Sequence, residues 1–273
     1  MEKEITDSPG ISILLPTRGR TEQLYRSVSS LIDLADDAAD IQWLFAFDND
    51  DRNSYEYFQS NILPAIESTG ALYTVMGFER LGYSRLNEYV NALALRSRGD
   101  WMVFWNDDAV MTSQSWDTVI KSYTGKFVLQ AFDTHKKHPY SIFPIVPRKW
   151  LELIGHLSLH ALNDAWLSQI AWMLDIVERI DVVVDHERFD LTGKNKDQTF
   201  KDRVIYEGNA NDPRDFNYLP RRQTRFREAD IIAKYLESTG VDMSHWHEIK
   251  AGKRNPWEKM MAADVNKQMT AYN

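Results

Sequence analysis

The sequence predicts an α/β fold with a mainly parallel central sheet, flanking helices and a C-terminal extension. Short apolar segments alternate with helical segments four times within about 110 residues, which is typical of consecutive βαβ units. The 273 residues are 43% hydrophobic and 26% charged, as in ordinary globular chains. The alternating pattern loosens after residue 186, so we expect one domain over residues 1–186 and an extension over residues 187–273.

The first strand is predicted over residues 11–15, where the chain is apolar and rich in β-branched residues. Pro16 is expected to end it, because proline has no N–H to donate to a sheet. A turn follows over residues 17–21, and Thr21 is a suitable N-cap for a helix that runs through Ile32.

The remaining elements follow from the same apolar periodicity. Further strands are predicted over residues 41–47, 71–76, 100–105, 127–132, 141–146 and 180–184. Helices are predicted over residues 55–66, with an interruption near Pro64, and over 82–95, 150–154, 164–179 and 228–238. Residues 187–225 are polar and predicted to be loop.

Composition excludes several classes of protein. Cysteine is absent, which excludes disulfides, thiolate metal sites and cysteine nucleophiles. No apolar run approaches the roughly 20 residues that span a bilayer. The first ten residues are acidic rather than apolar, so we expect no secretory signal and a cytoplasmic location.

The net charge of −8 is unevenly distributed. Residues 187–273 hold 16 basic and 14 acidic residues, whereas residues 1–186 hold 16 basic and 26 acidic residues. The acidic first part argues against nucleic-acid binding over the whole surface and suits a site for a divalent cation.

Acidic residues follow three of the predicted strands: Asp48–Asp51, Asn106–Asp108 and Asp185–His186. An acidic residue after a strand is often only a turn former. Parallel strands nevertheless bring their carboxyl ends to one edge, where ligands of open α/β sheets bind. We therefore expect these clusters to share a site.

Asn106, Asp107 and Asp108 form the most informative cluster, because they follow a strongly apolar strand. Adjacent carboxylates repel each other unless a cation or hydrogen bonds offset the repulsion. Mg²⁺ and Mn²⁺ bind one or two carboxylates together with substrate phosphates, and Mn²⁺ also accepts imidazole. Asp108 and His186 are thus candidate ligands for Mn²⁺ or Mg²⁺.

Other nucleotide-binding classes lack support. Neither GxGxxG nor GxxxxGK[ST] occurs, which disfavours a dinucleotide oxidoreductase and a P-loop NTPase. A sugar nucleotidyltransferase would need a Gly-rich loop after the first strand, where only Gly19 is found.

Six segments, in this order and spacing, resemble the GT-A fold of nucleotide-diphospho-sugar transferases, specifically family 2 glycosyltransferases. The segments are Ser12–Arg20, Phe45–Asp50, Gly82–Asn87, Phe104–Asp108, Leu162–Leu167 and Val182–His186. Together they cover roughly residues 10–190. The chain departs from the family pattern at Asn106, the first position of the DxD motif, and at Asn163, where a glutamate is usual. Leu86 also separates an arginine and an asparagine that are adjacent in the family.

The resemblance implies a metal-dependent, inverting transfer of a sugar from a nucleotide-diphospho-sugar, with a UDP-sugar as the expected donor. It makes Asp164 the catalytic base, and Asp108 and His186 the ligands of Mn²⁺ or Mg²⁺. The residues it assigns to the nucleotide-sugar are Pro16, Thr17, Arg18, Arg20, Asp48, Arg85, Asn106 and Asp107. A non-catalytic or nucleotidyl-transferring protein of the same fold is the alternative.

The extension over residues 187–273 is expected to lie on the acceptor side or to serve as a packing element. Residues 220–227 contain four arginines and a phenylalanine, and residues 249–257 form a second basic segment with a tryptophan. Arginine interleaved with aromatic residues is typical of nucleic-acid contacts, although it also fits a solvated helix. Two acceptors remain open: a hydroxymethylated pyrimidine in DNA, as in phage DNA modification, and a saccharide.

Overall fold

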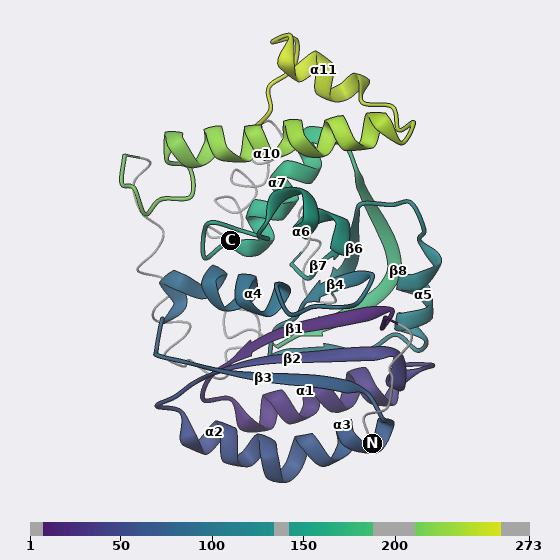
Figure 1. Ribbon diagram of the computed structural model, residues 1–273, viewed down its shortest axis with the longest axis vertical. Helices are drawn as coiled ribbons and strands as arrows, with labels where there is room; N and C mark the ends of the chain where they lie inside the picture. The colour runs from purple at the N-terminus through teal and green to yellow at the C-terminus, as the bar shows by residue number, and fades with distance from the viewer. Residues whose placement is uncertain (1–7, 134–141, 188–210, 258–273) are drawn as a thin grey trace, which may run out of the picture.

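The computed structural model describes residues 8–133, 142–187 and 211–257, and confirms the α/β fold with helices on both faces of a central sheet (Figure 1). Predictions for residues 134–141 and 188–210 lie outside the described residues. The sheet has eight strands in the order β3-β2-β1-β4-β7-β6-β8-β5. The boundary at residue 186 between domain and extension stays a prediction.

The sheet is parallel in its first half and mixed in its second. The strands are β1 (Ile11–Thr17), β2 (Ile41–Asp48), β3 (Leu72–Phe78), β4 (Trp101–Phe104), β5 (Ala109–Met111), β6 (Val128–Asp133), β7 (Pro144–Pro147) and β8 (Val177–His186). Strands β1 to β4 pair in parallel, and β6 pairs in parallel with β8. Strand β7 is antiparallel to both β4 and β6, and β5 is antiparallel to β8.

Pro16 does not end the first strand, contrary to the prediction. Strand β1 pairs with β2 through Thr17 but with β4 only through Leu14, which accepts a hydrogen bond from the Trp105 amide. Since backbone groups alternate along a strand, Pro16 faces the same side as Leu14, beyond the end of β4. Its missing N–H therefore costs the sheet no hydrogen bond.

One face of the sheet is covered by the helices α1 (Thr21–Asp33), α2 (Arg52–Tyr57) and α3 (Leu63–Thr69) (Figure 1). Thr21 is the first residue of α1 rather than its cap; the N-cap is Arg20, and no side chain caps the helix. A π-helical turn over Phe58–Ile62 separates α2 from α3, and Pro64 lies in the first turn of α3, where its missing N–H is tolerated. The predicted interruption is thus confirmed.

The opposite face carries α4 (Leu86–Ala94), α6 (Arg148–Ile154) and α7 (Asn163–Leu174), with α10 (Leu219–Ser238) and α11 (Ser244–Lys250) packed above them (Figure 1). Helices α5 (Trp116–Ser122) and α11 and strand β5 were not predicted, and α10 begins at Leu219, so the prediction of loop through residue 225 was wrong for its last residues. The helix predicted over residues 164–179 ends at Leu174, because Asp175 adopts a left-handed conformation with φ of 56°. The residues from Val177 onward belong to β8 instead.

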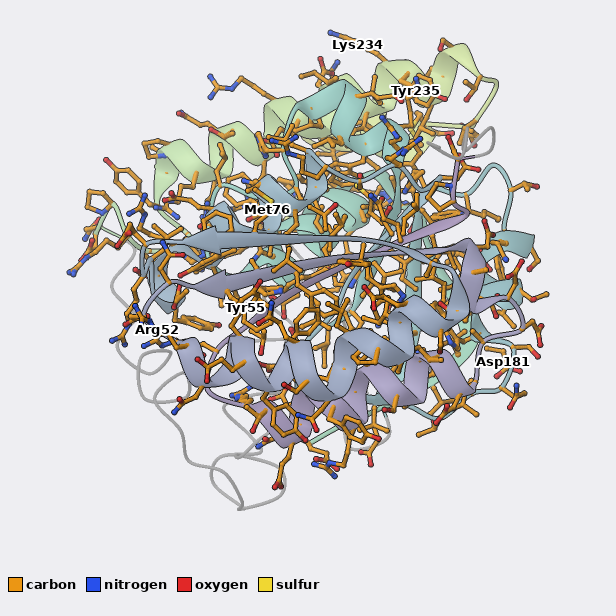
Figure 2. All side chains as sticks on the ribbon, turned by 60° about the horizontal axis from the view of Figure 1, so that its bottom comes forward. Arg52, Tyr55, Met76, Asp181, Lys234 and Tyr235 are labelled. Atoms are coloured by element: carbon orange, nitrogen blue, oxygen red, sulfur yellow. The ribbon has the colours of Figure 1, made fainter. Side chains whose placement is uncertain are left out.

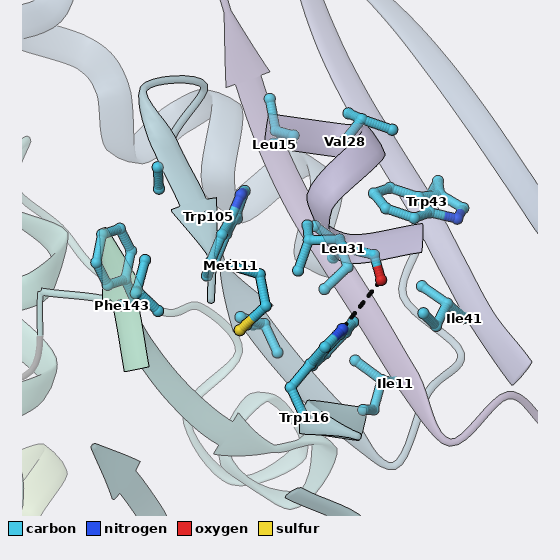
Figure 3. Packing of buried hydrophobic residues seen from close by; sticks show 14 of the residues in the cluster. Ile11, Leu15, Val28, Leu31, Ile41, Trp43, Trp105, Met111, Trp116 and Phe143 are labelled. Carbon is cyan, nitrogen blue, oxygen red and sulfur yellow. Dashed lines mark hydrogen bonds between the residues drawn. The ribbon is translucent and has the colours of Figure 1, made fainter. Parts of the chain in front are cut away.

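Two hydrophobic cores lie on the two faces. The side chains of β1 point alternately into these two cores. Ile11, Ile13 and Leu15 lie in the core under α1, and Leu14 lies in the core under α4 and α7. Figure 3 shows the first core, where the indole of Trp116 donates a hydrogen bond to the Leu31 carbonyl.

The described part of residues 211–257 contributes to the second core. Ile232, Leu236 and Trp246 are buried in it together with residues of α6 and α7. None of the helices that the structure describes has the length and apolar character needed to cross a membrane.

Candidate active site

Six polar side chains meet at the carboxyl ends of β1, β4 and β8, on the last residues of these strands or just after them. They form one mostly buried group, which we call the aspartate cluster. Its members are Thr17, Arg20, Asn106, Asp107, Asp108 and His186. Thr17 ends β1 and donates a hydrogen bond from its hydroxyl to Asp107 over 2.8 Å. Residues 90 positions apart are thereby joined, as the strand topology predicts.

Arg20 is the positive member of the aspartate cluster. Its Nη1 lies 2.7 Å from Asp107 Oδ1 and 3.0 Å from Asp108 Oδ2, so one guanidinium bridges both carboxylates. The arginine and the two aspartates are mostly buried, which strengthens this attraction relative to a surface ion pair.

The pairing of β5 with β8 brings His186 next to Asp108. In the antiparallel ladder of β5 and β8, His186 stands opposite Ala109, the residue after Asp108. The imidazole Nε2 consequently lies 3.2 Å from Asp108 Oδ1 and 3.4 Å from the side-chain nitrogen of Asn106. His186 is 3% exposed, so this imidazole points inward rather than into solvent.

The two aspartates differ in their affinity for a proton. Burial raises the pKa of Asp107, and the negative charge of Asp108 adds to this rise, so that Arg20 and Thr17 do not offset it. Burial also acts to raise the pKa of Asp108, but the hydrogen bond and charge of His186, with the charge of Arg20, outweigh it and lower the pKa to about 2. Asp108 is therefore the carboxylate that remains charged and suits a cation.

A second group forms beside the aspartate cluster, where β2 ends at Asp48. Arg18 donates to Asp48 over 2.9 Å and to Asp50 over 3.0 Å. The phenol of Tyr89 donates to the other oxygen of Asp48 and accepts the Leu81 amide. Burial, followed by the hydrogen bond to Asp48, raises the pKa of Tyr89 to about 12, so the phenol stays protonated.

The turn after β1 depends on glycine. Gly19 has φ of +66°, a left-handed conformation that residues with a side chain rarely adopt. Its amide donates to Asp51 over 2.7 Å and to the hydroxyl of Ser54 over 3.1 Å. The turn therefore places Arg18 and Arg20 on their separate carboxylate partners.

Three predicted site residues lie apart from these contacts. Pro16 is part of β1. Arg85 is exposed and pairs with Glu88 over 2.5 Å, an interaction within its own helical segment. Asp164 lies in the first turn of α7 and accepts the amide of Ala165 over 2.8 Å, so it acts at least as a helix-terminal acceptor.

The site as described fits a divalent ion only in part. Asp108 and His186 offer the oxygen and imidazole donors that Mn²⁺ accepts. Within residues 8–133, 142–187 and 211–257, however, no group of three or more acidic or histidine side chains is arranged to hold a metal ion. An ion at Asp108 would take its remaining ligands from phosphate oxygens and water, a common arrangement for Mg²⁺.

Sequence reasoning missed two supporting residues. Tyr89 holds Asp48, and Ser27 accepts the indole N–H of Trp105 while its own hydroxyl reaches the Asn106 carbonyl at 3.3 Å. Both lie on the buried sides of predicted helices that face the strand ends, and that position was the available signal.

The sheet order and the flanking helices define a GT-A-like fold. The mannosyltransferase PcManGT from Pyrobaculum calidifontis, in complex with GDP-Man and Mn²⁺, is similar with a TM-score of 0.54 and 11% identity, over 95% of this chain and 87% of that chain. TarS from S. aureus in complex with UDP-GlcNAc is similar with a TM-score of 0.50 and 10% identity, over 86% and 78% of the two chains. At these identities the likeness is one of fold. No protein-family model matches the chain, and no curated protein sequence matches it.

Proposed function

We propose that this protein is a glycosyltransferase that moves a sugar from a nucleotide-diphospho-sugar to an acceptor hydroxyl. The observation that carries the proposal is the aspartate cluster, built from β1, β4 and β8 at the edge where open α/β sheets bind ligands. The GT-A-like fold supports it, as does the GDP-Man or UDP-GlcNAc bound to the two similar enzymes.

The nucleotide half of the donor is assigned to the second group. Asp48, held by Arg18 and Tyr89, would accept hydrogen bonds from the base or ribose. Thr17 and Asn106 would line the ribose side, with Asp107 behind them. Preformed contacts of this kind keep the anomeric carbon oriented for attack without further ordering of the site.

The diphosphate half is assigned to the aspartate cluster. Asp108 and His186 would hold Mn²⁺ or Mg²⁺, which as a Lewis acid stabilises the leaving diphosphate. Arg20 already lies on the same carboxylates, and its guanidinium suits phosphate geometry, so it would contact the diphosphate as well. Arg85 is assigned to the diphosphate more loosely, because a phosphate would have to draw it away from Glu88.

The acceptor hydroxyl needs a base, and Asp164 is our candidate. It would take the hydroxyl proton as the acceptor oxygen attacks the anomeric carbon, which inverts the configuration at that carbon. An inverting outcome can be read directly from the anomeric configuration of the product.

The decisive experiment is a transfer and hydrolysis assay with a panel of UDP- and GDP-sugars in the presence of Mn²⁺. Wild type should release the nucleoside diphosphate, and Asp108→Asn and Asp164→Asn should each lower the rate at least a hundredfold. Asp181→Asn is the matched control, because it changes an exposed carboxylate of the same strand as His186. Asp181 also lies away from the site. Figure 2 shows it on the opposite side of the molecule from Arg52, the residue that begins α2 soon after the carboxyl end of β2.

Other outcomes have definite meanings. Donor binding without turnover by any acceptor would make the chain a non-catalytic binding protein. Release of pyrophosphate from a nucleoside triphosphate and a sugar phosphate would make it a nucleotidyltransferase. Product formed on DNA with hydroxymethylated pyrimidines would support a phage-type DNA modification, and product formed only on saccharides would exclude it.

A further inference from the structure

Two kinds of contact hold the imidazole of His186. Its Nε2 lies 3.2 Å from Asp108 and 3.4 Å from Asn106, which are polar contacts within the aspartate cluster. The ring also packs against the ring of Phe143, with the ring centres 5.0 Å apart and the planes at 64°. This is the edge-to-face arrangement that aromatic pairs prefer. The second contact brings an apolar residue into direct touch with a candidate metal ligand.

Phe143 belongs to a rigid part of the fold. It is 2% exposed and directly precedes Pro144, the first residue of β7. Strand β7 pairs with β4 on one side and with β6 on the other, so the sheet fixes the backbone next to Phe143. The side chain is part of the first hydrophobic core. Its ring is therefore held from behind by the protein interior.

The same ring packs on Trp105, with the two ring centres 5.0 Å apart (Figure 3). The register of the sheet accounts for this contact. Val103 of β4 pairs with Ile145 of β7 in an antiparallel ladder, and the same register two residues further on sets Trp105 opposite Phe143. The contact thus follows from strand pairing and does not depend on a flexible loop.

Trp105 connects Phe143 to the segment that carries Asp108. Its indole N–H donates to the buried hydroxyl of Ser27 on α1 over 2.8 Å, which fixes the indole. Asp108 follows Trp105 closely in the chain. Phe143 therefore touches both the strand end that leads to Asp108 and the imidazole of His186, so its ring links the two candidate ligands of the ion.

Histidine needs such a contact, because its own torsional preferences do not orient the ring. The χ2 torsion of histidine has broad minima, so the place of His186 on β8 leaves the rotation of the imidazole open. The contacts of Nε2 with Asp108 and Asn106 restrict this rotation, but they use the nitrogen that would bind an ion held by Asp108. The packing on Phe143 does not use this nitrogen, so it is kept when the ion binds.

We propose that Phe143 is a positioning residue, which holds the imidazole of His186 with Nε2 directed at the ion bound by Asp108. Phe143 itself touches neither ion nor donor and acts through His186. Residues that orient a metal ligand change metal affinity about 10–100-fold, and we expect the lower end of this range for an apolar contact. The proposal rests on the proposed function, because that function supplies the ion.

The test is calorimetric titration of the full chain with UDP, in the absence and in the presence of saturating Mn²⁺. The ratio of the two Kd values, which we call the Mn²⁺ enhancement, measures how much the ion strengthens nucleotide binding. The enhancement should exceed about tenfold in the wild type and should fall by about tenfold in Phe143→Leu. The Kd without Mn²⁺ should be equal in both proteins, because Phe143 lies outside the contacts of Asp48.

Phe58→Leu is the matched control. Phe58 is 0% exposed, belongs to the same core and packs on the rings of Phe45 and Phe47 in β2. The same loss of volume at a buried aromatic residue should lower the Tm in both variants, but only Phe143→Leu should lower the Mn²⁺ enhancement. Phe143→Tyr keeps the ring beside His186 and should retain the enhancement.

A double-mutant cycle with His186→Ala separates positioning from a general loss of packing. His186→Ala should lower the Mn²⁺ enhancement by itself, and adding Phe143→Leu should lower it no further, because Phe143 acts through the imidazole. An equal loss from Phe143→Leu in both backgrounds would overturn the proposal, and so would an unchanged enhancement in Phe143→Leu. If Phe143→Leu does not fold, Phe143→Met, which is also apolar and lacks the ring, takes its place.

Failure of the proposed function gives a different result. Absence of UDP binding by the wild type would remove the donor site, and this inference with it. UDP binding that Mn²⁺ does not strengthen in the wild type would remove the ion and the role of Phe143, but it would leave the nucleotide site in place. A normal enhancement in the wild type that survives in Phe143→Leu would overturn this inference alone.

Discussion

Replacing Arg20 tests whether the aspartate cluster is organised as the structure shows. Arg20→Met removes the one guanidinium that bridges Asp107 and Asp108 while keeping a side chain of similar length. The two carboxylates then repel each other in a buried setting with His186 as the remaining nearby partner of Asp108.

The expected loss follows from burial. The side chains of Arg20, Asp107 and Asp108 are 14%, 8% and 13% exposed. Removing one partner of a fully buried ion pair costs about 3–5 kcal/mol, whereas exposed pairs contribute about 0–1 kcal/mol. Because these side chains keep slight contact with water, we expect about 3 kcal/mol, which is a fall in Tm of about 6–12 °C.

The assay is urea and thermal unfolding of the wild type and the variant at pH 7. Arg26→Met is the control, because Arg26 lies one to two turns further along α1 and is itself exposed, 51% against 24% for its partner Glu187; it should cost less than about 1 kcal/mol. Added Mn²⁺ should raise the Tm of Arg20→Met more than that of wild type, because the ion no longer competes with the guanidinium. Equal stability of the Arg20 and Arg26 variants would refute the reasoning.

Three further predictions concern other buried polar groups. Burial lowers the pKa of His160 to about 4, below its unfolded value of 6.5. The free energy of unfolding should therefore fall by up to about 3 kcal/mol as the pH drops from about 6.5 to 4. Urea titrations of His160→Gln should lack this pH dependence. Asp117→Ala should cost about 2–3 kcal/mol in the same assay, because its carboxylate, 0% exposed, accepts two backbone amides of the loop after α1; a cost under 1 kcal/mol would contradict this. Tyr89→Phe should raise the Kd for UDP about tenfold in a calorimetric titration by loosening Asp48, and an unchanged Kd would remove Asp48 from the nucleotide site.

Local patterns were sufficient for the parallel half of the sheet. Each of its strands is a continuous apolar run followed by a turn, and each helix between them has its own apolar face. Strand β5 has only three residues, too few for a periodic signal, and it exists because β8 pairs with it. The end of α7 was misplaced for a related reason: Asp175 in a left-handed conformation stops the helix, although the apolar spacing continues through Val177.

The sequence placed Asp107 and Asp108 of the aspartate cluster at the sheet edge, but it did not predict the contacts of that cluster. Asp107 and Asp108 follow a strand that could only be buried, so their position at the sheet edge followed from the sequence. The left-handed turn at Gly19 separates the two arginines in space, so that Arg20, and not Arg18, bridges Asp107 and Asp108. Tyr89 meets Asp48 from a helix 41 positions away, and no local pattern carries such a contact.

Because β5 pairs with β8, the geometry of this site is more sensitive to an inserted or deleted residue in β8 than to a substitution. His186 faces Asp108 because it stands opposite Ala109 in an antiparallel ladder, and a shift of one residue turns every side chain of a strand to the other face. A single deletion between Val182 and Asp185 would therefore replace the imidazole at Asp108 by a different residue, even if every residue of the aspartate cluster were retained. Insertions and deletions in this strand should be tolerated far less than substitutions at its exposed positions.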